Sequence, residues 1–76
     1  MNASETSYWQ PTPARRVRDL MGWAGLSVED AARELEVDPA TIREWRSEGS
    51  KNKPPRMAIL ALERLTERWL RLEAGI

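Results

Sequence analysis

Apolar residues in the first third of the chain recur at the spacing of an amphipathic helix. Four of them fall at positions i, i+3, i+4 and i+7 and so share one helical face: Val17, Leu20, Met21 and Ala24. Thr12 followed by Pro13 is typical of a helix start, because a threonine oxygen can cap the first turn and proline has no N–H to satisfy. Gly25 suits the left-handed conformation that often ends a helix. The pattern therefore predicts a helix over about residues 13–24.

Residues 26–46 show helical spacing in two shorter segments. Ser27 can cap a first helix, which we expect from Val28 to about Leu35. Asp38 and Pro39 form a second start signal, so we interpret Asp38 as a structural cap rather than a contact with a partner. The segment therefore predicts two helices, each with its own start.

Only Glu36 and Val37 separate these two helices, so the helices must cross steeply. Ala32 is small enough to let them approach closely, and Ile42 and Trp45 on the second helix face back toward the first. Two short helices joined in this way are typical of a helix-turn-helix motif, whose second helix usually enters the major groove of DNA. The second helix is the predicted recognition helix.

The chain after the recognition helix predicts a loop and one long helix. We expect Gly49 to end the recognition helix as a left-handed residue, and residues 50–55 to form a basic loop. Pro54 and Pro55 predict the start of a last helix that continues to near Ala74. Such a helix is ~28 Å long, which is more than a domain of this size needs for its own core.

The last helix has a wider apolar surface than one stripe. Leu65, Trp69 and Leu72 lie on its second half, where they either pack on the domain itself or form a contact with a second subunit. We favour the homodimer, because a small chain without disulfides is stabilised most by association and a two-fold dimer suits a palindromic site.

Together these elements predict an all-α fold, a small four- to five-helix domain with a central helix-turn-helix. We divide the chain into a polar N-terminal arm (residues 1–12), a helix-turn-helix DNA-binding region (13–56) and a C-terminal helix for dimerisation (57–76). In the arm, Tyr8 and Trp9 either anchor the arm to the domain or contact a partner.

Composition narrows the class of function. The 76 residues include no cysteine and no histidine, which removes the usual nucleophiles, general bases and metal ligands. The acidic residues are scattered, so we expect no enzyme, no metal, no cofactor and no small-molecule ligand. No apolar run is long enough to span a membrane and the N-terminus has no apolar signal core, so we expect a soluble, cytoplasmic protein without membrane contact.

The net charge is zero, but the charges are unevenly distributed. Residues 27–37 hold one basic and four acidic side chains, whereas residues 38–56 hold five basic and three acidic ones. Arg15, Arg16 and Arg18 lie on the first helix, where they either flank DNA or only solubilise the helix. The distribution favours a modest positive footprint on the recognition helix and the loop after it, with strong salt dependence.

The stretch LSVEDAARELEV…TIREW resembles the helix-turn-helix of the Cro/phage-repressor (XRE-like) family. The following W-R-S-E-G-S-K-N-K-P-P is similar to that family's exit from the recognition helix, and the resemblance covers roughly residues 14 to 65. Small size and the R-E-W…P-P…A-L-E-R-L ending are similar to anti-CRISPR-associated repressors of phages and mobile elements. The family commonly has glycine where this chain has Glu36. Either Glu36 takes a left-handed conformation, at about 1 kcal/mol, or the turn has another shape.

The recognition helix offers several candidate contacts with double-stranded DNA. Arg43 is the strongest, because its forked guanidinium can bond guanine O6 and N7 together. Thr41 and Ala40 could touch a thymine methyl, whereas Glu44 could accept from cytosine N4 or hold an arginine by a salt bridge. The residues expected at phosphates are Arg46, Ser47, Lys51, Asn52 and Lys53.

These observations predict a sequence-specific transcriptional repressor of a phage or mobile element that binds an inverted-repeat operator as a homodimer. The resemblance implies in addition that it autoregulates an anti-CRISPR operon. Two alternatives stay open. The chain could be a DNA-binding antitoxin that holds a toxin, or a helix-turn-helix module that binds only proteins.

Overall fold

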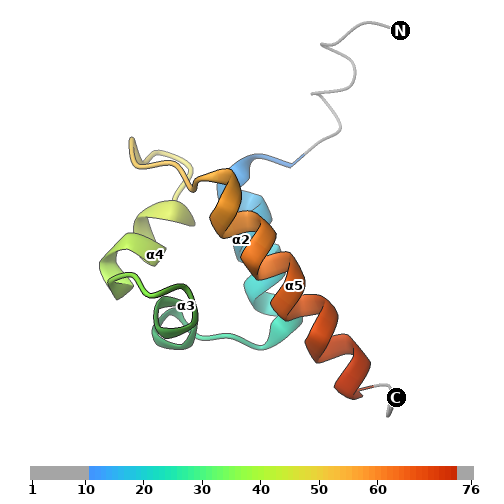
Figure 1. Cartoon of the computed structure of the whole chain (residues 1–76). Coiled ribbons are helices and arrows are strands. Elements are labelled where there is room, and N and C mark those ends of the chain that lie inside the picture. The colour runs from blue at the N-terminus through green and yellow to red at the C-terminus, as the bar shows by residue number, and fades with distance from the viewer. Residues whose placement is uncertain (1–10, 74–76) are drawn as a thin grey trace, which may run out of the picture.

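The computed structural model describes residues 11–73, which form four helices and no strand. Helix α2 spans Pro13–Ala24, α3 spans Val28–Leu35, α4 spans Pro39–Trp45 and α5 spans Arg56–Glu73. Helices α2 and α5 lie side by side, and the α3–α4 pair packs beside them (Figure 1). The all-α fold with a central helix-turn-helix is therefore confirmed. Tyr8 and Trp9 of the predicted arm, and the predicted end of the last helix at Ala74, lie outside the described residues.

Helix α2 begins and ends where its sequence signals predict. The Thr12 hydroxyl oxygen accepts a hydrogen bond from the Arg15 backbone N–H at 3.2 Å, and Pro13 occupies the first turn. Gly25 is left-handed, with φ 66° and ψ 30°, and the next N–H, of Leu26, donates to the Met21 carbonyl at 2.9 Å. Glycine takes this conformation without the steric penalty of a Cβ. The chain can therefore turn sharply from α2 into α3.

Helix α3 is fixed by a capping box at its start. The Ser27 side chain accepts from the Asp30 N–H at 3.0 Å, and the Asp30 carboxylate accepts from the Ser27 N–H at 3.4 Å. At the other end Glu36 is left-handed, with φ 57° and ψ 45°. The Val37 N–H then donates to the Ala32 carbonyl at 2.9 Å. Of the two shapes that the sequence left open for the turn, the structure has the left-handed one, at a steric cost of about 1 kcal/mol.

Helix α4 differs from its predicted ends. Asp38 takes the backbone position of an N-cap, but its side chain makes no capping hydrogen bond, so only the backbone part of that prediction holds. The prediction that Gly49 ends the helix as a left-handed residue is wrong. The helix ends at Trp45, and Gly49 does not have a positive φ. Because the Arg46 and Ser47 N–H groups donate to carbonyls within α4, the chain leaves the helix through an ordinary turn and needs no left-handed residue.

Helix α5 runs in the same direction as α2 and extends past its end (Figure 1). It begins at Arg56, just after the predicted Pro54 and Pro55, and the Pro55 carbonyl accepts from the N–H groups of Ala58 and Ile59. Its 18 residues make it ~27 Å long, close to the predicted length. No helix among residues 11–73 is both long enough and apolar enough to cross a membrane.

The core lies where α2, α4 and α5 meet and continues between α3 and α4. Val17, Ile42 and Leu62 are its largest fully buried side chains. Ala31 and Ala32 are also buried, at 0% and 3% exposure, so α3 can lie close against α4. The structure adds one polar residue that the apolar pattern did not reveal. Thr66 is buried on α5, and its hydroxyl is within 2.8 Å of the Leu62 carbonyl and 3.1 Å of the Leu20 carbonyl on α2.

Candidate nucleic-acid interface

Helix α4 has a buried face and an exposed face, as the sequence predicts for a recognition helix. Ile42 and Trp45 are turned into the core, with 0% and 7% of their surfaces exposed. The opposite face carries the four predicted base contacts. Thr41 is half-buried, and the other three are exposed, namely Ala40, Arg43 and Glu44. These side chains can be changed without opening the core, which is the arrangement that reading of base edges requires.

Arg43 lies beside an acidic residue of α3. Its Nη2 is 3.2 Å from the Glu29 Oε2, and both side chains are about three-fifths exposed, at 60% and 64%. An ion pair so open to water contributes little stability. Glu29 contacts only one of the guanidinium nitrogens, so the remaining donors stay available for a guanine. The geometry is compatible with the predicted base-reading role, which stays a prediction.

Glu44 and Asn52 have partners that the sequence did not predict. The buried Trp45 donates its Nε1–H to the Asn52 Oδ1 at 3.2 Å, and Asn52 Nδ2 donates to the Glu44 Oε2 at 3.3 Å. Glu44 is therefore held by an amide, whereas the sequence suggested a salt bridge with an arginine as the alternative to base contact. The reason is that the loop folds back over the last turn of α4, where a tryptophan N–H requires an acceptor. Asn52 thus holds the loop against α4, a contact in addition to the phosphate contact that the sequence predicted for it.

The connection between α4 and α5, together with the first residue of α5, concentrates cations that have no acidic partner among the described residues. Residues 46–56 hold four basic side chains and one acidic side chain. Within residues 11–73, none of the four takes part in an ion pair, although six other arginines of the chain do. These four are Arg46, Lys51, Lys53 and Arg56. Three of them are predicted phosphate contacts, and the other two predicted contacts, Ser47 and Asn52, are exposed beside them.

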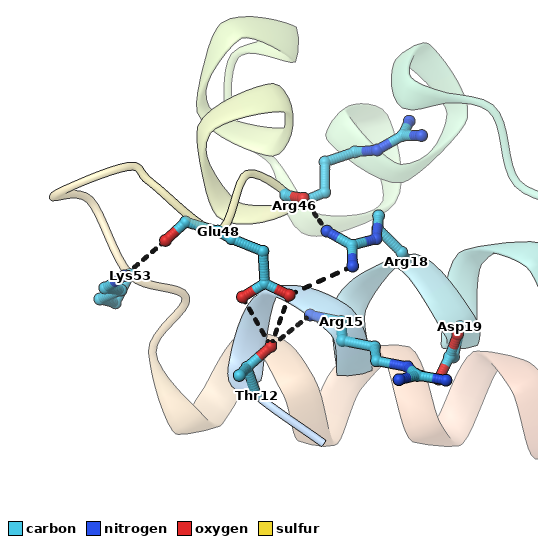
Figure 2. Close-up of polar contacts among 7 residues, drawn as sticks. All are labelled: Thr12, Arg15, Arg18, Asp19, Arg46, Glu48 and Lys53. Atoms are coloured by element: carbon cyan, nitrogen blue, oxygen red, sulfur yellow. Dashed lines mark hydrogen bonds and ion pairs between the residues drawn. The ribbon is translucent and has the colours of Figure 1, made fainter.

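The arginines of α2 all contact other groups of the protein. The sequence had suggested only that they flank DNA or keep the helix soluble. Arg15 pairs with Asp19 at 3.8 Å within the helix. Arg16 pairs with Glu63 of α5 at 2.9 Å and lies over the Trp23 ring. Arg18 donates from Nη1 to the Arg46 carbonyl at 2.7 Å, so it joins α2 to the end of α4 (Figure 2).

Glu48 is the residue that sequence reasoning missed. Figure 2 shows its carboxylate facing α2, where the Thr12 hydroxyl donates at 2.8 Å and Arg18 Nη2 lies 3.2 Å away. The hydrogen bond from Thr12, followed by the contact with Arg18, holds the pKa of Glu48 below its ordinary value. Its position as the one acid in a basic connection was the available signal. No group of three or more acidic side chains able to hold a metal ion occurs among residues 11–73.

The comparisons with known proteins give a family for this arrangement. A helix-turn-helix family model described as "Transposase" matches residues 14–76, which include α3, α4, α5 and all of α2 except its first residue, Pro13. No curated protein and no solved structure matches the chain. The match supports the helix-turn-helix DNA-binding domain expected from the sequence, but it does not extend to the Cro/phage-repressor family or to anti-CRISPR-associated repressors. The chain belongs to the helix-turn-helix family described as "Transposase".

Proposed function

We propose that the chain binds a specific double-stranded DNA sequence of a mobile genetic element through α4, as a homodimer, and represses transcription from a nearby promoter. One observation carries the proposal. The exposed face of α4 with Arg43 is followed at once by residues 46–56, which hold four cations without an acidic partner among the described residues. Base edges would be read by the helix and phosphates by the connection, which is the usual division of contacts. A bound dimer would exclude polymerase from the promoter.

The homodimer is supported by the exposed apolar surface of α5. Trp69 and Leu72 remain 41% and 64% exposed, and they line a groove with the half-buried Leu65 and Leu26. Burying a large apolar side chain is worth about 1.5–3 kcal/mol, so a few of them offset much of the cost of association. The occupant that we propose for this groove is the same face of α5 from a second copy. In such an isologous contact each residue is buried twice, once on each subunit.

The family match favours a second candidate function. A domain of a family described as "Transposase" would bind the ends of a mobile element rather than a promoter. Both functions use the same DNA-binding surface and differ in where the target sequence lies. In either case we propose binding without catalysis, because the chain has no histidine or cysteine. An anti-CRISPR operon as the target is a hypothesis that rests on the sequence resemblance alone.

Selection of binding sites from random double-stranded DNA, followed by mapping of the enriched sequence onto the source genome, tests these functions. A site overlapping the promoter of the protein's own gene would support the repressor, and copies at both ends of a mobile element would support the second candidate. Arg64→Ala, which removes an exposed cation from α5, serves as the control for variants of α4. No enriched sequence at low salt would contradict both functions and favour a protein-interaction module.

A further inference from the structure

We infer that Glu48 is a positioning residue for DNA recognition: it fastens the connection between α4 and α5 to α2, so that the cations of this connection meet DNA in one arrangement. The inference rests on the proposed DNA binding. Glu48 is the single acidic residue among residues 46–56, which makes it unfavourable for attraction of DNA and calls for another role.

The first observation is the contact between Glu48 and the start of α2. The Thr12 hydroxyl lies 2.8 and 2.9 Å from the two carboxylate oxygens, although the residues are 36 positions apart in sequence. The same hydroxyl accepts the Arg15 N–H that caps α2 (Figure 2). One side chain thus caps a helix and holds the connection, so the position of the connection is set by a rigid element.

The second observation is that the attachment has several points. Arg18 spans two of them, since its Nη1 bonds the Arg46 carbonyl at 2.7 Å and its Nη2 bonds the Glu48 carboxylate at 3.2 Å. Lys53 Nζ donates to the Glu48 carbonyl at 3.2 Å. Residues 46, 48 and 53 are therefore held together, and the cations at 46, 51 and 53 are presented by one ordered segment.

This arrangement has two opposite effects on binding. Ordering the segment before DNA arrives removes an entropic cost from binding, but only for DNA whose phosphates match the fixed positions. The negative charge of Glu48 meanwhile weakens attraction to any DNA. Removing Glu48 should therefore raise non-specific affinity and lower the advantage of the specific site, which makes Glu48 a determinant of specificity without contact with a base.

Three variants test the inference. Glu48→Ala removes the carboxylate, Glu48→Gln keeps one acceptor oxygen for Thr12, and Glu67→Gln removes the same charge from an exposed ion pair on α5 as a control. Hydrogen exchange of the Ser50 and Asn52 amides reports the order of the connection, because these amides donate at 3.2 and 3.1 Å within it. Dissociation constants are measured for the selected site and for a scrambled duplex, with folding checked by circular dichroism.

We expect Glu48→Ala to speed exchange of these amides and to lower the ratio of specific to non-specific affinity at least about fivefold, with Glu48→Gln intermediate and Glu67→Gln like wild type. Thr12→Val keeps the charge of Glu48 but removes one of its two partners, so it should lower specific affinity without raising non-specific affinity. Unchanged exchange, or an unchanged affinity ratio in folded Glu48→Ala, would overturn the inference while wild type still binds its site. A wild-type protein without any preferred sequence would instead overturn the proposed function.

Discussion

At the scale of single residues, α4 separates folding from recognition. Ile42 and Trp45 supply the apolar contacts that hold the helix, whereas Arg43 projects into solvent between them in sequence. The Glu29 carboxylate lies near Arg43 but is itself exposed, so a guanine edge can replace it at little cost. A change at Arg43 should therefore affect DNA binding far more than folding.

We expect Arg43→Ala to weaken binding to the selected site by about 1–3 kcal/mol and to relax the preference at one base pair. The measurement is a titration of wild type and variant on the site and on duplexes changed at single base pairs. Arg64→Ala is the control, since it removes another exposed positive charge, from α5. Equal affinity of a folded Arg43→Ala protein for the site would remove Arg43 from the interface.

Lys51 and Lys53 belong to a different kind of contact. If both meet phosphates, replacing both by alanine should weaken all DNA sequences alike and flatten the slope of log K against log salt by about 2. Lys51→Arg with Lys53→Arg keeps both charges and should keep the slope. A slope that does not change in the alanine variant would mean that both lysines are solvated and do not contact phosphates.

The sequence predicts some residues well and others not at all. The buried stripe of α2 follows from helical spacing, because each apolar residue lies three or four positions from the next. The partner of Glu48 could not be predicted in this way. Thr12 lies 36 residues away, and only the packing of α2 against the end of α4 brings the two side chains together. Thr66 was missed for a similar reason, since the Leu20 carbonyl comes close to it only when α5 packs on α2.

At the scale of elements, the sequence signals predict where α2 and α3 begin, whereas only one of the two predicted glycine stops is present. Ser27 and Asp30 form the reciprocal cap of α3 that their spacing allows, and Gly25 ends α2 as expected. Gly49 does not end α4, because carbonyls of a helix end can also be satisfied by ordinary turns. The turn between α3 and α4 instead depends on Glu36, a residue with an unfavourable left-handed backbone.

Relief of that strain should stabilise the protein. We expect Glu36→Gly to raise the free energy of unfolding by about 1 kcal/mol, because glycine adopts a positive φ without a clash. Glu34→Gly, two residues earlier and inside α3, should lower it by about 1 kcal/mol. Urea unfolding followed by circular dichroism compares the two. A Glu36→Gly protein that is less stable than wild type would mean that the turn does not hold the left-handed conformation in solution.

Two carboxylates should make these helix starts sensitive to acid. The hydrogen bonds from Ser27 lower the pKa of Asp30, and those from Thr12 and Arg18 lower the pKa of Glu48. A depressed pKa in the folded state means stability that is present above the ordinary pKa and is lost as pH falls through the lowered one. The melting temperature should therefore fall as pH drops below about 4.5, and less steeply in Asp30→Asn and Glu48→Gln. Identical pH profiles for wild type and both variants would contradict this assignment.

At the scale of the whole molecule, α5 reaches past the rest of the domain (Figure 1). Its face against α2 buries Ala58, Leu62 and Thr66, whereas its last turns leave Trp69, Leu70 and Leu72 exposed. This exposed apolar end of the helix is the basis for the proposed dimer. Apolar spacing in the sequence predicted the helix and its wide apolar surface. The spacing could not show which residues of α5 are covered by α2, because that depends on where the shorter helix α2 ends.

We expect Trp69→Glu to give a folded monomer, because it would bury a charge in the proposed contact. Binding to the selected site should weaken strongly, because one dimer no longer contacts both half-sites, which lie ~34 Å or ~10 bp apart. Light scattering at about 50 μM with circular dichroism decides. Trp23→Glu changes an exposed tryptophan on α2 and should leave the dimer intact. A monomeric wild type, or a dimeric Trp69→Glu protein, would rule out this interface and remove the basis for an inverted repeat.

The close approach of α3 to α4 has a consequence for how such a protein can change over evolutionary time. Ala31 and Ala32 leave no room for a larger side chain between the two helices, so drift at these positions is confined to residues of similar size. Ala40 and Arg43, by contrast, face outward and touch none of this packing. In the proposed function, mutation can therefore change the target sequence through the outer face of α4 alone, while the inner face continues to specify the same fold.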